Sequence, residues 1–151
     1  MSQPISSFME RQVWTVDMDD TVAEVESLFA RQGLSWAPVL ESRRTIMGAI
    51  SASDLLQFHA QGKDPSAVPA WQLCSYKPLT VSPDTPVSEV ARLMIENKIH
   101  HVVVMDSEGI AGVVSSLDFV RTFVRDRRDP GSRAAHCEAL PDHAVSGLTG
   151  Q

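Results

Sequence analysis

The fold is decided by residues 98–118, which read KIHHVVVMDSEGIAGVVSSLD. Two histidines, His100 and His101, precede an apolar run, a turn follows at 106–109, and a second apolar run ends at Ser115. Apolar runs separated by a short turn are typical of paired antiparallel strands. Asp118 follows three residues later. The stretch therefore predicts a β-hairpin that ends in a hydroxyl and a carboxylate.

The same pattern occurs earlier in the chain. From Thr15 to Glu41, adding 65 to a residue number reaches a similar residue, and from Ile46 to Asp54 the offset is 64. The offset changes in the turn, so one hairpin turn is a residue shorter than the other. Among the counterparts are Ser51 for Ser115 and Asp54 for Asp118. An internal repeat of this kind indicates two similar structural units.

Length and composition favour one globular domain. The chain has 151 residues, of which 43% are hydrophobic, enough for one ordinary core. Two repeats of about 60 residues would each be marginally stable alone. We therefore expect them to pack together through a shared apolar face.

Charge and cysteine content exclude several classes of protein. A net charge of −6 argues against a general nucleic-acid binder, and an anionic ligand would need a local basic patch. Two cysteines without a CxxC spacing suit a reducing compartment, with the cytoplasm as the expected location. No signal peptide and no apolar run of about 20 residues is present, so neither secretion nor a membrane span is expected.

The first repeat reads as helix, strand, helix, hairpin and helix. We predict a short helix at 5–11, strands at 13–16, 36–40 and 45–50, and helices at 22–31 and from Ser51 or Ser53 to about residue 60. Asp20 or Thr21 should begin the helix at 22–31 and Gly33 should end it. Gly48, inside a predicted strand, indicates either a close backbone approach by a ligand or another chain, or a bulge.

The second repeat follows the same order. A strand is predicted at 78–81, and a helix should begin at Asp84 or Thr85 because Pro86 suits the first helical position. The hairpin and a helix at 116–127 complete the copy. The predicted domains are 5–61, a linker at 62–70, a second repeat at 71–128 and a flexible tail at 129–151. The tail contains His136, Cys137 and His143, whose spacing matches no metal site, so no metal is expected.

The repeated heptads GAISASD at 48–54 and GVVSSLD at 112–118, each after the same helix and strand order, resemble the tandem cystathionine β-synthase (CBS) domain pair. The resemblance covers residues 5–127. It implies an α/β (α+β) fold in which two β-α-β-β-α repeats pack as one pseudo-symmetric pair. It further implies a cleft that binds AMP, ADP, ATP or S-adenosylmethionine as effector, with no cofactor required, and association into homodimers.

Carried over residue by residue, the resemblance implies a principal site in the second repeat. Asp118 would hold the ribose hydroxyls, Ser115 would lie near the α-phosphate beside helix N–H groups that favour anions, and the histidines would meet the phosphates. The alternatives are a helix cap for Ser115 and Asp118 and surface histidines for the pair. The implied set is Thr80, Val81, His100, His101, Val102, Ser115, Asp118 and Arg121.

The first repeat lacks the cations of the second. Where the second has Lys98, His100 and His101, the first has Gly33, Ser35 and Trp36, which cannot neutralise a phosphate. Trp36 could stack on a base or pack in a dimer interface. The implied second and weaker site comprises Thr15, Val16, Trp36, Ala37, Ser51 and Asp54.

Three function classes follow. A regulatory or energy-sensing module that binds an adenosine nucleotide fits best, because the sequence shows no nucleophile–base pair and no glycine-rich phosphate loop. A structural dimerisation module without ligand is the alternative, and an enzyme is not expected. The output would pass to a separate effector protein or through a change in assembly. The homodimer is expected because the helices have more apolar residues than a small core would hide: Val22, Leu28, Leu55, Phe58, Leu93 and Phe119.

Overall fold

The computed structural model describes residues 3–128, and the predicted tail at 129–151 lies outside them. The chain divides into two compact units, Met1–Ser116 and Leu117–Gln151. The first unit contains both repeats up to the end of the second hairpin. The described part of the second unit is a single helix, α4 (Ser116–Arg127), which begins at the boundary.

The first repeat builds a three-stranded sheet in the order β1-β2-β3, and its element bounds are β1 (Val16–Asp17), α1 (Val22–Gln32), β2 (Trp36–Glu41), β3 (Thr45–Ser51) and α2 (Ala52–Ala60). β1 runs parallel to β2, and β2 pairs antiparallel with β3. The predicted hairpin and both helices are confirmed.

The second repeat builds an equivalent sheet, β4-β5-β6, with bounds β4 (Thr80–Val81), α3 (Val87–Glu96), β5 (His101–Asp106) and β6 (Gly109–Ser115). Each sheet has a bulge at the corresponding place, between Val39 and Leu40 in β2 and between Val104 and Met105 in β5. The loop between β5 and β6 is one residue shorter than that between β2 and β3, which confirms the offset in the repeat.

Local sequence explains where the helices of the first repeat begin and end. Thr21 and Glu24 form a capping box at the start of α1. The Glu24 N–H donates to the Thr21 hydroxyl oxygen, and the Thr21 N–H donates to the Glu24 carboxylate. Ser51 and Asp54 form the same box at α2. Gly33 ends α1 in the left-handed conformation, with φ 63°. These predicted boundaries are confirmed.

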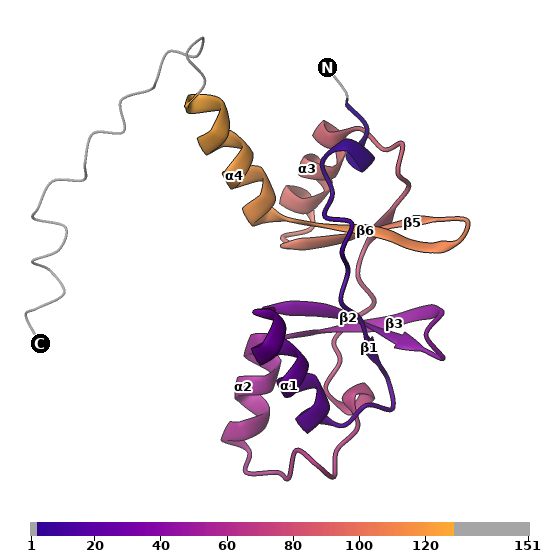
Figure 1. The fold of residues 1–151 in the computed structure, drawn as a ribbon, viewed down its shortest axis with the longest axis vertical. Helices are drawn as coiled ribbons and strands as arrows, with labels where there is room; N and C mark the ends of the chain where they lie inside the picture. Colours follow the sequence, from indigo (N-terminus) through magenta and orange to yellow (C-terminus); the bar gives the residue numbers. More distant parts are fainter. Residues whose placement is uncertain (1–2, 129–151) are drawn as a thin grey trace, which may run out of the picture. The chain divides into compact units, whose positions relative to one another are not determined.

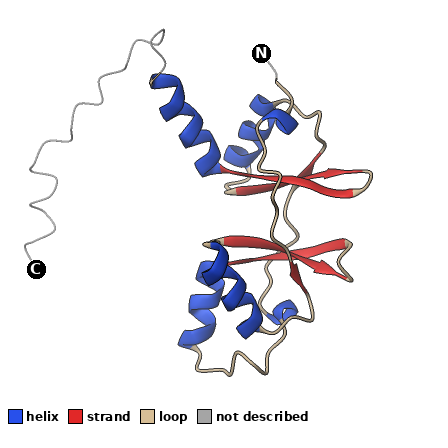
Figure 2. Ribbon diagram, viewed as in Figure 1, coloured by secondary structure: helices blue, strands red, loops and turns tan. Residues whose placement is uncertain are grey.

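The two sheets of the Met1–Ser116 unit face each other, with helices on their outer sides (Figures 1 and 2). α1 and α2 cover the first sheet and bury Val25, Phe29 and Phe58 in its core. Between the sheets, a small apolar cluster joins Leu40 and Ile46 to the buried Val103, with Trp36, Met105 and Ile110 packed against it. The repeats therefore share an apolar contact, as the composition suggested.

Two segments cross from one repeat to the other. The N-terminal segment, including the 3₁₀ helix η1 (Ile5–Ser7), packs on the second repeat, where Glu10 pairs with Val113 in β6 through two backbone hydrogen bonds of 2.9 and 3.0 Å. The segment between α2 and β4, residues 61–79, is called the linker from here on. It contains the 3₁₀ helix η2 (Ala70–Gln72) and packs on the first repeat, where the Ser75 N–H donates to the Ala49 carbonyl at 2.9 Å. Each repeat is completed by the segment that precedes the other.

This crossing corrects two predicted boundaries. The predicted helix at 5–11 is only the η1 turn, because Glu10 is extended in its pairing with Val113. Pro86 is the N-cap of α3, in extended conformation with ψ 141°, rather than its first helical residue. The Val87 N–H donates to the Gln3 carbonyl at 2.8 Å, so the N-terminal segment holds this stretch extended and delays the helix by one residue.

Gly48 is explained by the crossing linker. A Cβ at this position would collide with the Ser75 carbonyl oxygen and lie 3.0 Å from the Cys74 Sγ. At the equivalent Gly112, a Cβ would lie 2.6 Å from the Met9 Sδ and 2.9 Å from the Glu10 carbonyl. Gly48 also pairs with Val39, the residue next to the bulge. A bulge thus lies beside Gly48, as one alternative predicted, and the close approach is made by the chain itself rather than by a ligand or another chain.

Candidate functional site

A cavity of about 420 Å³ lies within the first unit and is lined by residues of both repeats. The strand ends contribute Trp36 and Ser51 from the first repeat and His100 and His101 from the second. Its other lining residues are Ser35, Ala49, Ser53, Ser75, Tyr76, Lys77, Pro78, Leu79 and Ile99. The volume suits a small molecule, since ligand pockets measure about 300–1,000 Å³.

The cavity combines residues that the sequence analysis divided between two sites. The Trp36 and His101 rings stack with centroids 4.5 Å apart and an interplanar angle of 1°. These residues are counterparts in the repeat, at the starts of β2 and β5. The principal-site histidines thus lie with Trp36 and Ser51 of the predicted weaker site.

The hydroxyl and carboxylate at the end of β3 form a helix cap. The Ser51 N–H donates to Asp54 Oδ2 at 2.8 Å, and the Asp54 N–H donates to Ser51 Oγ at 3.2 Å. The Ala52 N–H donates to the Ser35 carbonyl at 2.8 Å. These three N–H groups at the start of α2 are engaged within the protein, and formal positive charge for an anion comes from side chains. Ser51 and Asp54 thus form a helix cap, the alternative given above for the equivalent Ser115 and Asp118.

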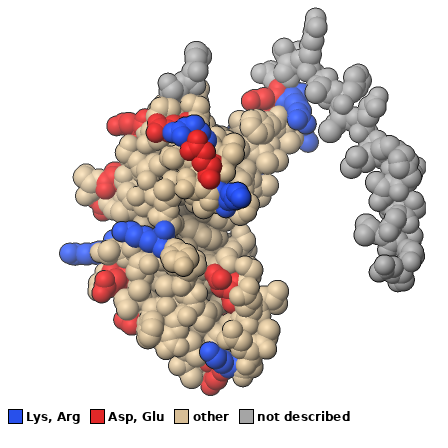
Figure 3. Space-filling model, turned by 180° about the vertical axis from the view of Figure 1, so that it is seen from behind, with Lys and Arg blue, Asp and Glu red and all other residues tan. Residues whose placement is uncertain are grey.

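The cavity lining is basic in an acidic protein. Among the described residues that line it, Lys77 is the one lysine or arginine, accompanied by His100 and His101, and none is an aspartate or glutamate. An anion bound there would meet no carboxylate on these walls, while the whole chain carries a net charge of −6. On the face shown in Figure 3, acidic and basic side chains are otherwise interspersed.

Other predicted site residues lie away from this cavity. The side chains of Val16, Ala37 and Val102 are buried in the core. Thr15 lines a separate cavity of about 310 Å³ with Val16, Asp17 and Arg43, and Asp54 lines one of about 180 Å³ with Lys63.

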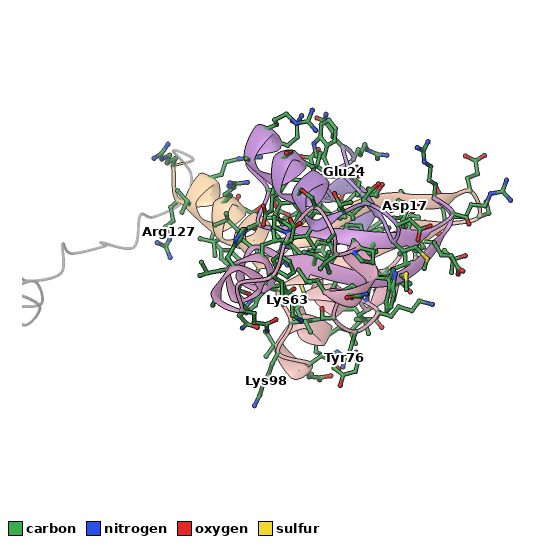
Figure 4. The ribbon with its side chains drawn as sticks, turned by 90° about the horizontal axis from the view of Figure 1, so that it is seen from below. Asp17, Glu24, Lys63, Tyr76, Lys98 and Arg127 are labelled. Atoms are coloured by element: carbon green, nitrogen blue, oxygen red, sulfur yellow. The ribbon has the colours of Figure 1, made fainter. Side chains whose placement is uncertain are left out.

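The rest of the principal set is on β4, β6 and α4. Thr80 and Val81 pair with Val103 and Val104, and Ser115 pairs with His101. Asp118 and Arg121 belong to α4 in the second unit, where Arg121 Nη1 lies 3.8 Å from Asp118 Oδ1. Lys98 is not among the lining residues, and its side chain extends outward from the edge of the molecule (Figure 4).

Cys74 adds no charge beside the site. Burial raises the pKa of its thiol, a backbone hydrogen bond lowers it, and the Asp54 carboxylate raises it again, for a net rise. The thiol is therefore protonated at neutral pH.

Tyr76 and Lys77 were not among the predicted site residues, and no motif marks them. The sequence signal nearest to them is Gly48, which indicated a close approach to β3, and residues 74–75 make that approach. Tyr76 follows these two residues directly.

Two features are absent from the described part of the chain. Across residues 3–128, no three His, Cys, Asp or Glu side chains are grouped to hold a metal ion. His136, Cys137 and His143 lie outside this range. None of the helices within it has both the length and the apolar content for a membrane span.

Comparison with known proteins shows where this arrangement occurs. The family model for the CBS domain matches twice, at residues 5–60 and 70–125. An uncharacterized protein of Methanocaldococcus jannaschii is 30% identical over 124 residues, covering 81% of this chain and 44% of that protein. The chain therefore spans less than half the length of this relative.

Two solved structures share the fold. The CBS domain pair of protein MJ0100, in complex with methylthioadenosine and S-adenosyl-L-methionine, aligns with a TM-score of 0.72 at 20% identity, over 83% of this chain and 99% of that chain. The CBS domain of a bacterial CNNM/CorC family Mg²⁺ transporter, in complex with ATP, aligns with a TM-score of 0.72 at 22% identity, over 80% and 87%. With both halves matched by the family model, the chain belongs to the CBS domain family and carries two such domains in tandem.

Proposed function

We propose that the chain is a cytoplasmic regulatory module that binds an adenosine compound, such as AMP, ADP, ATP or S-adenosylmethionine, in the cavity between its two repeats. The observation that carries the proposal is the lining of that cavity, which joins Lys77, His100 and His101 to serine hydroxyls without an acidic side chain. Cations there favour a phosphate or carboxylate, and hydroxyls hydrogen-bond to ribose.

The related structures support the ligand class. The MJ0100 pair binds two adenosine compounds and the CNNM/CorC domain binds ATP. The low identities carry the fold alone to this chain, so the ligand rests on the cavity. A binding module rather than an enzyme is proposed, with its output read by a separate effector protein or by a change in assembly.

Isothermal titration calorimetry of the full chain against AMP, ADP, ATP and S-adenosylmethionine tests this function. We expect saturable binding of at least one compound and a rise in melting temperature that grows with its concentration. Saturable binding with no thermal stabilisation, or no binding of any of the four, would contradict the proposal.

The second candidate, a structural dimerisation module, has one observation in its favour. Leu56 on α2 is 74% exposed and lies in an apolar groove with Leu34 on the α1 side and Leu55 on α2. Glu26 on α1 and His59 on α2 are hydrogen-bond partners in the same groove. An apolar patch with a polar rim is typical of a protein interface.

The basis of the predicted homodimer is partly corrected. Val22, Leu55 and Phe58 are not surplus, because they are buried in the core of the first repeat. The homodimer remains a proposal that rests on Leu56 and its groove. Sedimentation velocity should give a dimer for the wild type and a monomer for Leu56→Glu, with Gln57→Glu on the same helix as the charge control. A wild type that sediments only as a monomer at micromolar concentration would exclude it.

A further inference from the structure

The linker crosses the cavity on a short segment that is held at both ends. At one end, the Ser75 N–H and Oγ both donate to the Ala49 carbonyl in β3, at 2.9 and 3.1 Å. At the other end, the Leu79 carbonyl accepts from the Val103 N–H in β5 at 3.1 Å. Tyr76, Lys77 and Pro78 lie between these anchors and all line the cavity. A ligand in the cavity therefore meets a segment tied to both sheets.

Tyr76 is 95% exposed, the most exposed large apolar or aromatic side chain of the described residues. Covering an exposed aromatic ring with a planar apolar surface is favourable, because it removes both surfaces from water. Stacking of a base on an aromatic side chain contributes about 1–3 kcal/mol per base to the binding free energy. The same cavity contains the stacked rings of Trp36 and His101. A base bound there has aromatic surface available from the strand ends and from the linker.

Lys77 follows Tyr76 directly and provides the formal positive charge of the cavity lining. The N–H groups of Ser51, Ala52 and Asp54 at the start of α2 already have acceptors within the protein. The formal positive charge that neutralises an anionic group in the cavity comes from side chains. A lysine ammonium is positively charged at neutral pH, whereas a histidine is positively charged only when protonated.

We propose that the linker residues Tyr76 and Lys77 select the ligand. Lys77 binds the anionic group of the adenosine compound, and Tyr76 closes over its base. This assignment rests on the proposed function and adds to it two residues outside the repeated strand ends. It makes Lys77, rather than Lys98 or Arg121, the residue that distinguishes a phosphorylated ligand from adenosine.

The charge is tested with Lys77→Met, which keeps the length of the side chain and removes its charge. Calorimetry with AMP and with adenosine should show about a tenfold loss of affinity for AMP, the scale of one charge-assisted hydrogen bond, and none for adenosine. Lys63→Met is the matched control, because Lys63 belongs to the same linker but lines a different cavity. It should leave both affinities unchanged.

The stacking is tested with Tyr76→Ala and Tyr76→Phe. The alanine variant should bind AMP and adenosine more weakly by the same factor, about tenfold, and the phenylalanine variant should bind both as the wild type does. Circular dichroism melting establishes that each variant is folded.

The outcomes separate this inference from the function on which it rests. If the wild type binds AMP and Lys77→Met binds it equally well, or if Lys98→Met instead loses AMP affinity, the inference is wrong and the function stands. Equal losses for AMP and adenosine in Lys77→Met would also overturn it. A wild type that binds neither compound overturns both.

Discussion

Trp36 and His101 occupy the same position in the two repeats, but their chemistry differs. Trp36 is a neutral ring at the start of β2, and His101, at the start of β5, gains a charge on protonation. The structure brings the two side chains into one stacked pair in one cavity. Counterparts in a repeat therefore meet where the repeats face each other, and a site cannot be assigned to one repeat by reading that repeat alone.

The carboxylates after the hairpins show a second difference. Asp54 accepts a hydrogen bond from the Ser51 N–H at 2.8 Å, while Asp118 has Arg121 at 3.8 Å on its own helix. At the position of Arg121 the first repeat has Gln57. The second carboxylate thus has a cationic neighbour that its counterpart lacks.

The largest expected effect compares these two carboxylates. Asp118→Ala should weaken AMP binding by about 1.5–3 kcal/mol, the value of hydrogen bonds to a charged group, which is roughly a tenfold to hundredfold loss. Asp54→Ala should change AMP affinity little, because the first repeat lacks the histidines and the arginine of the second. Calorimetry on both variants measures the ratio. Equal losses, or a larger loss for Asp54→Ala, would show that the principal site is not in the second repeat.

The next comparison concerns the two strand glycines. Gly48→Ala should lower the free energy of unfolding by about 1–3 kcal/mol, the usual cost of overpacking, because the new Cβ meets the Ser75 backbone oxygen. Gly112→Ala should cost less, since its nearest neighbour is the flexible side chain of Met9. Urea unfolding followed by circular dichroism gives both values. A larger loss at Gly112 would show that the N-terminal segment is held more rigidly than the linker.

A smaller effect is expected from the helix caps. α1 begins with a side-chain cap at Thr21, whereas α3 begins at Pro86 without one. Thr21→Ala should therefore cost about 1 kcal/mol of stability, and Thr21→Ser, which keeps the acceptor oxygen, should cost less. Chemical denaturation of the two variants tests this. If they are equally destabilised, the loss comes from the methyl group of Thr21 and not from its hydroxyl.

The smallest expected effect is a pH dependence of binding. An imidazole that carries a proton attracts a phosphate, so the affinity for a phosphorylated ligand should rise modestly from mildly alkaline to mildly acidic pH. Adenosine, which carries no phosphate, should bind with little change and is the control. His101→Gln should reduce the rise for AMP. A rise that persists in a variant lacking both histidines would show that another group of the protein is responsible, because a phosphate that gains a proton loses charge.

The sequence predicted the features that depend on nearby residues. The Thr21 and Ser51 caps, the Gly33 helix end and both hairpins follow from local chemistry and from the repeat, and the structure confirms them. The predicted helix at 5–11 and the predicted start of α3 were wrong. Contacts between segments far apart in the sequence keep Glu10 and Pro86 extended.

The candidate site could be predicted only in part. Trp36, Ser51, His100 and His101 were expected at ligand sites and line one cavity, although they were divided between two. Tyr76 and Lys77 could not be found, because their place depends on the path of the linker between the sheets. The roles of these residues in binding remain predictions for the experiments above.

The crossing of the N-terminal segment has a consequence for how the chain folds. Glu10 and Val113 are paired although more than a hundred residues separate them. When the chain grows from its N-terminus, residues 3–10 have no β6 to pair with until almost the whole described chain has been made. Closing so long a loop carries an entropic cost and slows folding, so this pairing should form late. Residues 3–10 are thus made long before β6 but are among the last to reach their final place, and until then β6 lacks the strand-like segment that pairs with it.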